Sequence, residues 1–436
     1  MIPALSRVQS ALSEPPGFNR HIENALVSDV LIIGSGGAGC AAAHEASQRL
    51  GRVVMLTRGG FLESKTARAQ GGIQAAVGDA DTTSRHFADT MAAGENANDS
   101  ELVQILTSSA SNTIDWLEQQ GVRFDREGAD YRLQAAGGLS MPRILSCGDV
   151  SGNRIMAQMA EMVKNDGVRV VEHAAVLSIR PQRGFFAVDV LTLQDGAGYS
   201  LRTAAIIIAA GGVIPSEKRA GLELPGGEQI PDGLQLAAAA GAEVVNPDLM
   251  QYHPTGIVLP KSLRRKPVPE VVRAAGAELL NSEMKPFVDA LTTRRKVCDA
   301  IVNECQQGRC VTTEDGRKGV WLDTPAIDQK QGAGHTAQSF PAFYREMLEL
   351  GHDITRQLVL VYPLAHYSLG GIRIDANTRT TVRGLFAAGE ATWGVHGKDR
   401  LMGNSLLDIF VFGRIAGQQA ACYAEKHPVP AGSTER

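Results

Sequence analysis

The stretch Ser28-Asp29-Val30-Leu31-Ile32-Ile33, followed by Gly34-Ser35-Gly36-Gly37-Ala38-Gly39, decides the fold class of this chain. The first half is a β-branched run that predicts a buried strand, and the second half has the pattern GxGxxG. Residues 40–50 then predict a helix of small side chains, and Arg52-Val53-Val54-Met55-Leu56 predicts a second strand. This order indicates a Rossmann-type dinucleotide site, because the glycines let the backbone approach a pyrophosphate that the helix N-terminus faces.

The residues after the second strand indicate which dinucleotide binds. NAD sites of this type carry an acidic residue about 20 positions after the glycines, and Thr57-Arg58 occupies that place here. Since a hydroxyl can still bind a ribose, the pattern disfavours an NAD dehydrogenase and favours FAD. Two later strand–glycine turns, at residues 205–212 and 384–390, agree with a long dinucleotide that crosses several strand ends.

Length and composition set broad limits on the function. The chain has 436 residues, 44% of them apolar and 21% charged, so two or more globular domains are expected. The net charge of −4 provides no general attraction to nucleic acid, and no apolar run reaches the length of about 18 residues that spans a bilayer. The six cysteines have no CxxC spacing, which predicts reduced thiols of a cytoplasmic protein and no metal site.

We expect an α/β protein with a Rossmann-like FAD-binding domain of the glutathione-reductase type and an inserted α+β capping domain. Short apolar strands alternate with helical stretches such as residues 101–119, and a closing helix begins at Ser405. The expected division is an N-terminal extension, a discontinuous FAD-binding domain, a cap richer in charge, and a tail. Their boundaries are 1–28 for the extension, 29–246 and 353–424 for the FAD-binding domain, 247–352 for the cap, and 425–436 for the tail.

Four further blocks stand in a fixed order along the chain: Ala69-Gln70-Gly71-Gly72-Ile73, Gln251-Tyr-His-Pro-Thr-Gly256, Ala365-His-Tyr-Ser-Leu-Gly-Gly371 and His396-Gly-Lys-Asp-Arg-Leu-Met-Gly-Asn-Ser-Leu406. Together they make the chain resemble the FAD-dependent flavoprotein family of fumarate reductase, succinate dehydrogenase and L-aspartate oxidase. The resemblance covers roughly residues 29–420. It implies that a C4 dicarboxylate lies against the flavin, between the FAD-binding domain and a mobile cap.

The resemblance also implies anchors for the substrate. His253 and His366 each donate a hydrogen bond to a carboxylate, Arg400 binds one carboxylate through its guanidinium fork, and Thr255 supports His253. Such groups suit the chemistry, because a dianion that leaves water needs compensating cations and donors. The alternative for each histidine is a satisfied core residue. We favour the site because each histidine stands beside a turn rather than in the middle of a strand.

The resemblance assigns proton transfer to three charged residues. Arg294, in Leu291-Thr-Thr-Arg-Arg-Lys-Val297, matches the cap arginine that faces the substrate, and Glu270 with Arg273 matches the relay that reloads it. The three-residue spacing places Glu270 and Arg273 on one helix face, where an exposed ion pair is the alternative. We expect the neighbouring Arg295 and Lys296 to lie on the solvated cap surface.

The cofactor site is expected to hold FAD without a covalent bond, since Lys65 occupies the place of the histidine that links FAD in succinate dehydrogenases. A lower flavin potential follows from that difference. The residues that we expect to contact FAD are Gly34, Gly36, Gly37, Ala38, Gly39, Thr57, Arg58, Ser64, Lys65, Thr66, Gln70, Gly71, Gly72, Val176, Ala210, Gly211, Asp232, Glu390, Asn404, Ser405 and Leu406.

Two departures affect the substrate prediction. Ala136 stands where L-aspartate oxidases carry a glutamate near the substrate amine, and Pro269 replaces a threonine before the relay glutamate. The leading hypothesis is therefore a fumarate reductase or succinate dehydrogenase type of enzyme acting on a dicarboxylate. The alternatives are an L-aspartate oxidase that forms iminoaspartate and hydrogen peroxide, and a non-catalytic flavin-binding electron carrier. The electron partner stays open among O2, a quinone and a small redox carrier.

Overall fold

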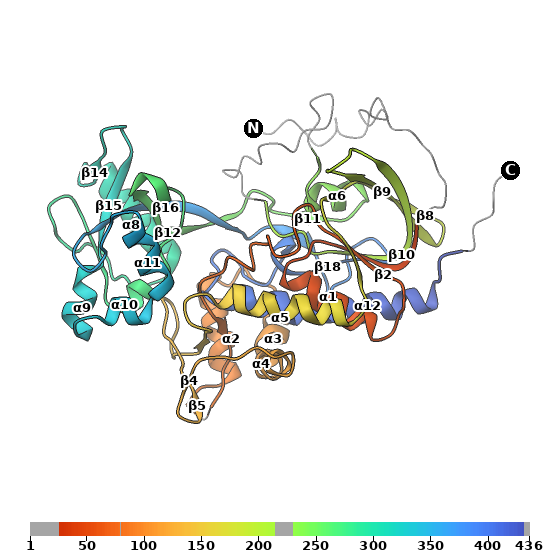
Figure 1. Ribbon diagram of the computed structural model, residues 1–436, viewed down its shortest axis with the longest axis horizontal. Helices are drawn as coiled ribbons and strands as arrows, with labels where there is room; N and C mark the ends of the chain where they lie inside the picture. Colours follow the sequence, from red (N-terminus) through yellow and green to blue (C-terminus); the bar gives the residue numbers. More distant parts are fainter. Residues whose placement is uncertain (1–25, 79, 214–229, 431–436) are drawn as a thin grey trace.

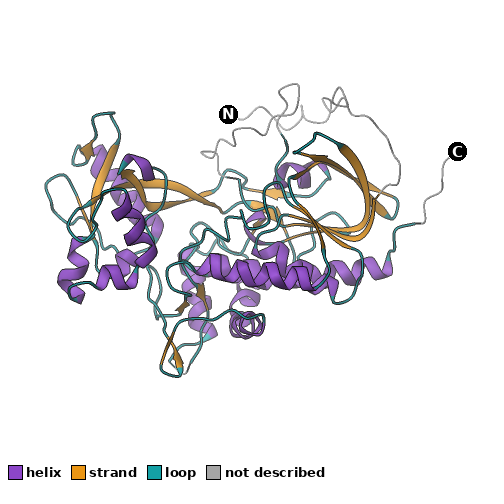
Figure 2. Ribbon diagram, viewed as in Figure 1, coloured by secondary structure: helices purple, strands orange, loops and turns teal. Residues whose placement is uncertain are grey.

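The computed structural model describes residues 26–78, 80–213 and 230–430. It has two lobes. The larger one contains a wide sheet, and two long strands connect it to the smaller one (Figures 1 and 2). The α/β prediction is confirmed. Most of the predicted N-terminal extension, residues 1–25, lies outside the described residues, and residues 26–28 already belong to the first strand.

The predicted strands around the glycine motif form the centre of the larger lobe. Within the described residues the main sheet has seven strands in the order β7-β2-β1-β10-β9-β8, with β18 beside β10. Strands β7, β2, β1, β10 and β18 pair in parallel, whereas β9 runs antiparallel to both β10 and β8. The bounds are β1 Leu26–Ile33, β2 Val53–Leu56, β7 Arg169–Val171, β8 Ala174–Gln182, β9 Phe185–Thr192, β10 Gly198–Ile208 and β18 Leu385–Ala387.

Two helices lie side by side on this sheet (Figure 1). Helix α1 (Gly37–Ser47) begins inside the glycine motif, and α12 (Asn404–Lys426) is the predicted closing helix. A Cβ at Gly413 would come within 2.6 Å of the Ala38 carbonyl oxygen, so the glycine permits the close approach. Helix α5 (Ser151–Asn165) also packs against α1.

The rest of the larger lobe supports these layers. The predicted helix at residues 101–119 is interrupted at Ser109, which ends one helix and begins the next. The other elements are α2 Thr83–Ala93, α3 Ser100–Ser108, α4 Ala110–Gln119, α6 Gly233–Ala239, η3 Gly389–Ala391, β3 Ile73–Gln74, β4 Arg126–Glu127, β5 Asp130–Tyr131, β6 Ile144–Leu145, β11 Val244–Val245, β17 Gly371–Arg373 and β19 Thr392–Trp393.

The smaller lobe has a five-stranded sheet and a hydrophobic core of its own among the described residues. Its elements are β12 Met250–Leu259, β13 Glu278–Leu280, β14 Val311–Thr312, β15 Lys318–Asp323, β16 Val359–Ser368, η2 Lys261–Leu263, α7 Val271–Ala274, α8 Arg294–Gln306, α9 Pro325–Gln331, α10 His335–Ser339 and α11 Pro341–Glu349. This core continues through Ile354, Val359 and Val361, which lie past the predicted cap end at residue 352. The division into domains stays a prediction.

Candidate active site

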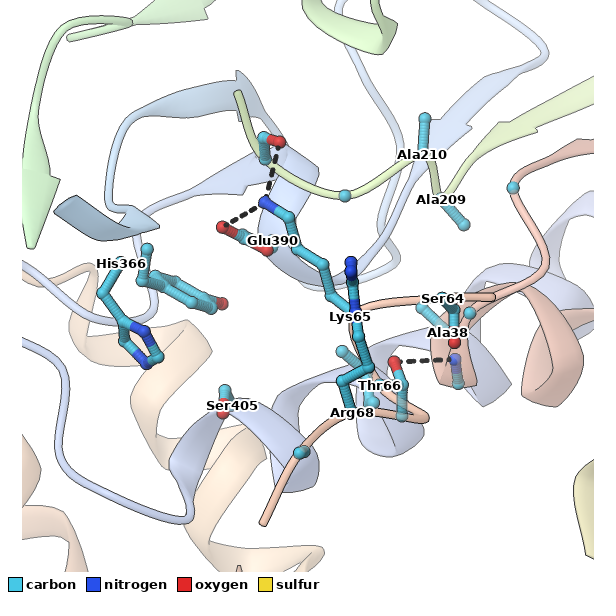
Figure 3. A pocket seen from close by; sticks show the side chains of 18 of the residues that line it. Ala38, Ser64, Lys65, Thr66, Arg68, Ala209, Ala210, His366, Glu390 and Ser405 are labelled. Atoms are coloured by element: carbon cyan, nitrogen blue, oxygen red, sulfur yellow. Dashed lines mark hydrogen bonds and ion pairs between the residues drawn. The ribbon is translucent and has the colours of Figure 1, made fainter. Parts of the chain in front are cut away.

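A large cavity of about 1290 Å³ reaches from the glycine motif of the larger lobe to β12 and β16 of the smaller one. It is larger than the roughly 300–1,000 Å³ of ordinary small-molecule pockets. Figure 3 shows part of its lining, with Lys65 and Thr66 from the loop after β2, Ser405 from α12 and His366 from β16. The cavity therefore brings together segments from most of the length of the chain.

The glycine motif forms one end of this cavity. Gly34 has a φ of +111°, and a Cβ there would lie 2.3 Å from the Ala209 carbonyl oxygen of the neighbouring strand end. A Cβ at Gly39 would lie 2.0 Å from the Gly34 oxygen. The two glycines thus permit a turn that no larger residue fits. The first N–H of helix α1, that of Gly37, donates to the Thr66 hydroxyl at 3.2 Å, and the N–H groups that follow in the first turn suit a phosphate.

The other predicted cofactor residues mostly line the same cavity. Lys65 donates to the Gly212 carbonyl oxygen at 3.3 Å and lies 3.7 Å from Glu390, as Figure 3 shows. The Thr57 hydroxyl accepts from Ser35 at 2.9 Å, so Ser35 is a lining residue that the sequence prediction missed. The predicted residues that line the cavity are Gly34, Gly36, Gly37, Ala38, Thr57, Arg58, Ser64, Lys65, Thr66, Gln70, Gly71, Gly72, Val176, Ala210, Gly211, Asp232, Glu390, Ser405 and Leu406.

Two predicted cofactor residues do not reach the cavity. Gly39 packs against Gly34, as described above. Asn404 points away: its Oδ1 lies 2.8 Å from Nε2 of His86, and its amide nitrogen donates to Thr90 at 3.0 Å. Burial lowers the pKa of His86 to about 4, so this ring is neutral and donates from Nε2. Asn404 therefore fastens the start of α12 to α2.

At the other end of the cavity a buried carboxylate lies between two arginines. Oε2 of Glu270 accepts from Nε of Arg294 at 2.6 Å, and its Oε1 lies 3.1 Å from Nη2 of Arg273. Burial opposes ionisation of Glu270, but Arg294 and Arg273 outweigh it and lower the pKa of the carboxyl below its usual value. Glu270 precedes the single turn of α7, and Arg273 lies behind it, away from the cavity.

The two arginines of residues 291–297 point to different surroundings, as expected. Arg294 is the first residue of α8, is buried and faces the cavity. The exposed Arg295 forms an ion pair with Glu95 at 3.0 Å, and Lys296 is exposed. A helical start turns consecutive side chains about 100° apart, which explains this separation.

The positions of the two histidines correct one expectation. Both lie inside strands rather than beside turns: His253 on β12 and His366 on β16. The pairing of these strands shifts register at both places, so that His366 falls between two paired residues and His253 precedes a second irregularity. Bulges of this kind re-aim side chains. The two rings lie edge to face with centroids 5.1 Å apart, and both residues line the cavity.

The hydrogen bonds of His253 determine which nitrogen carries its proton. The backbone N–H of Thr255 lies 3.3 Å from Nδ1, and because an N–H only donates, Nδ1 must accept. Burial and the nearby Arg294 lower the pKa of His253 well below its usual value, so the ring is neutral. Its Nε2 therefore carries a hydrogen. Thr255 is fully buried and outside the cavity lining, which fits the supporting role predicted for it.

Arg400 is a further cation that lines the cavity. It is buried, its guanidinium lies 4.6 Å above the ring of Tyr367, and Nη1 donates to the Leu401 carbonyl oxygen at 3.0 Å. Among the described residues its Nε has no hydrogen-bond partner. Burial lowers its pKa to about 10, which still leaves it charged at neutral pH. An anion in the cavity would satisfy the remaining donors.

Gln251 is a second residue that sequence reasoning did not assign to the site. Its Oε1 accepts from Nη1 of Arg294 at 2.9 Å, and it is buried. It lies two positions before His253 on the same strand, and alternate strand residues share a face. That spacing is the signal that could have identified it.

Two structural absences concern metals and membranes. Among the residues that the structure describes, no group of His, Cys, Asp or Glu side chains could hold a metal ion. Within the same ranges no helix combines the length and the apolar character that a membrane crossing needs.

Comparisons with known proteins agree with this geometry. A family model described as an FAD binding domain matches residues 29–406. One subunit of the fumarate reductase (CoM/CoB) of Methanothermobacter marburgensis is 36% identical over 90% of this chain and 72% of its own length. The L-aspartate oxidase of Caulobacter vibrioides is 34% identical over 90% and 76%. A variant of the FrdA chain of E. coli quinol fumarate reductase matches in structure with a TM-score of 0.84, 26% identity, and coverage of 94% and 72%.

Proposed function

Because this chain belongs to the FAD-binding family that includes fumarate reductases and L-aspartate oxidases, and is an FAD-dependent oxidoreductase, we propose that it reduces or desaturates a C4 dicarboxylate. The observation that carries this proposal is the convergence of five polar groups on one end of the cavity. They are Arg294, Arg400, His253, His366 and Glu270.

The cavity residues fit FAD. A Cβ at Gly34 or Gly39 would collide with neighbouring backbone, and the glycine turn and the start of α1 line the cavity. When bound, FAD supplies hydride transfer at its N5 atom, and the protein supplies orientation and charge. Lys65 interacts with Gly212 and Glu390, and lysine does not form the covalent link of succinate dehydrogenases, so we propose that FAD is held without a covalent bond.

The substrate end of the cavity suits a small dianion. Arg400 presents a guanidinium with a donor left over, and neutral His253 presents a hydrogen on Nε2. Transfer of a dianion out of water costs several kcal/mol per charge unless cations and donors replace the water. The second histidine, His366, has its pKa lowered well below the usual value by burial and Arg294, and so also acts as a neutral polar group.

Arg294 is the proposed proton donor. An arginine pKa exceeds about 12, so the residue can release a proton only while the neighbouring substrate carbon gains negative charge. Glu270 accepts from Arg294 and contacts Arg273 on its other side, which provides a route to reload the guanidinium. We propose that these three residues act as one relay.

The carboxylates of the cavity disfavour L-aspartate as the substrate. Among the described lining residues four carry a carboxylate, and each already has partners: Glu63 with Gly60 N–H, Asp232 with the start of α6, Glu270 with two arginines, and Glu390 with Lys65 and Ser368 N–H. The ammonium of aspartate needs a free carboxylate. Ala136 instead belongs to an apolar cluster with Ile144 and Met402.

Two assays separate the candidates. Anaerobic fumarate with a reduced dye should be turned over by the purified, yellow protein, with the dye oxidised in step with succinate formation. L-Aspartate under air should give no hydrogen peroxide. Peroxide with aspartate and no reaction with fumarate would establish the oxidase instead, which the similarity to L-aspartate oxidases keeps as the second candidate.

A non-catalytic flavin carrier is the third candidate. It predicts that Arg294→Ala and the wild type behave alike on every dicarboxylate tested.

We further propose a cytoplasmic enzyme whose electrons are exchanged with O2, a quinone or a small redox carrier. Steady-state assays that supply each of these partners in turn, with the substrate present at saturation, identify which one is used.

A further inference from the structure

A buried carboxylate next to Arg400 connects two parts of the site. Asp399 is 4% exposed, its Oδ1 accepts from Nε2 of Gln251 at 2.5 Å, and its Oδ2 accepts from the backbone N–H of Arg295 at 3.0 Å. Arg295 is the second residue of α8, directly after Arg294. One carboxylate in the larger lobe thus holds the first turn of the helix that carries the proposed proton donor.

The contact between Asp399 and Gln251 links Asp399 indirectly to the side chain of Arg294. Nε2 of Gln251 faces two acceptors, Asp399 Oδ1 and the Arg400 carbonyl oxygen at 2.7 Å. Since only the NH2 group can donate to both, the amide has one possible orientation. Its oxygen must then face Arg294, from which it accepts at 2.9 Å. The orientation of Gln251 is therefore set by Asp399 and transmitted to the guanidinium.

We propose that Asp399 is a positioning residue for Arg294, acting on its backbone through the Arg295 N–H and on its side chain through Gln251. The inference rests on the proposed function, because it treats Arg294 as the proton donor. Arg400 follows Asp399 directly, so the same short segment places the substrate-binding arginine and controls the orientation of the proton donor. Neither Asp399 nor Gln251 needs to touch the substrate for this role.

The substitution Asp399→Asn tests the proposal with almost no change in shape. An asparagine has one acceptor oxygen and one NH2 group, whereas Asp399 accepts on both sides. Whichever way the amide turns, its NH2 group meets a donor, either Gln251 Nε2 or the Arg295 N–H. One of the two contacts is lost, and Arg294 loses either its helix anchor or its oriented glutamine.

A matched control exists at another contact between the lobes. Asp149, in the loop before α5, accepts from the backbone N–H groups of Ala342 at 2.7 Å and Phe343 at 3.1 Å, at the start of cap helix α11. It is also a buried carboxylate that binds a cap helix from the larger lobe. Both N–H groups donate to the same oxygen, Oδ2, so an asparagine could keep both bonds, whereas Asp149→Ala removes them. Because no arginine of the site contacts Asp149, Asp149→Ala reports what a lost link between the lobes does by itself.

The experiment compares the two variants with the wild type as FAD-loaded enzymes. In Asp399→Asn, kcat for fumarate should fall about 100-fold with KM nearly unchanged, since a displacement of about 1 Å costs that factor. Asp149→Ala should keep the wild-type kcat. Equal losses in both variants, or a raised KM with an unchanged kcat, would overturn the proposal. If Asp399→Asn does not fold, Gln251→Met removes the same link and should show the same kcat loss.

Crystal structures make the result independent of activity. If the wild type turns over no dicarboxylate, the proposed function fails, but the positions of the side chains still decide this inference. In Asp399→Asn either Arg294 should leave Gln251, or the Arg295 N–H should leave the side chain at position 399 and the start of α8 should shift. Neither change should occur in Asp149→Ala. In Asp399→Asn, an Arg294 that keeps its 2.9 Å contact with Gln251 on an α8 that has not moved contradicts a positioning role.

Discussion

Replacement of Arg294 by alanine is the most direct perturbation of the proposed mechanism. The buried guanidinium donates from Nε to Glu270 at 2.6 Å and from Nη1 to Gln251 at 2.9 Å, and its Nη2 forms an ion pair with Glu270. Alanine removes the proposed proton donor and leaves Glu270 with Arg273 as its remaining close arginine.

The expected loss is large. A positioned acid contributes about 10² to 10⁴ in rate, and we expect the upper end because no other lining residue donates from the same place. A fall of about 10⁴ in kcat corresponds to about 5.4 kcal/mol, at 1.36 kcal/mol per factor of ten. Removal of one partner from a buried ion pair costs up to about 3–5 kcal/mol of stability, which Arg273 reduces here.

The assay is anaerobic reduction of fumarate by a reduced dye, with flavin absorbance as the measure of intact enzyme. Arg294→Lys is the informative companion, because it keeps the positive charge but has a single nitrogen that cannot bridge Glu270 and Gln251 together. Its kcat should fall about 100-fold, between alanine and wild type. A melting temperature that is unchanged in both variants would indicate that the ion pair adds little stability.

One result would refute the reasoning outright. If Arg294→Ala holds FAD, binds the dicarboxylate and keeps kcat within a few-fold of the wild type, the residue does not donate the proton. The relay through Glu270 then has no function in turnover. A loss confined to KM would instead make Arg294 a substrate anchor.

Three further predictions concern the cofactor and pH. Gly34→Ala places a Cβ against the Ala209 carbonyl oxygen at a positive φ, so the purified protein should lack flavin absorbance, and a yellow variant would show that the turn can adjust. Acid precipitation of the wild type should release all FAD into the supernatant, whereas a yellow pellet would indicate a covalent bond despite Lys65. The pKa values of His253 and His366 are lowered in the folded state, so only the unfolded chain takes up their protons below its usual pKa of 6.5. Their contribution is complete above pH 6.5 and is lost as the pH falls, so the melting temperature should drop on acidification and His253→Gln should flatten that drop. An equal dependence of the melting temperature on pH in the wild type and in His253→Gln contradicts this prediction.

Much of the site could be predicted because its signals are local. GxGxxG after a β-branched run specifies a strand, a turn and a helix start within about a dozen residues, and the structure has them in that order. Five of the seven predicted catalytic residues face the cavity, and the other two, Thr255 and Arg273, lie directly behind His253 and Glu270. What each of them does in turnover stays a prediction.

The misses share a physical cause. Asn404 belongs to a sequence block that predicts cofactor binding. Its side chain instead contacts His86, which lies 318 positions earlier in the chain. The strand positions of His253 and His366 depend on a register shift between β12 and β16, which no single strand specifies by itself. Side-chain direction at such places follows from which segments pair, and pairing is a property of the folded chain.

The residues alone therefore determined the dinucleotide fold, the cofactor type and most of the charged groups of the site, since these follow from short-range sterics and from the residue types in contiguous blocks. Only the tertiary structure decided how Gln251 and Asp399 join Arg294 to Arg400. Those four residues come from three separate segments, and the hydrogen bonds of Asp399 and Arg400 to Gln251 and Arg295 cross between the cap and the larger lobe. Donor and acceptor geometry across such a contact is set by the packing of the two lobes, which local sequence does not encode.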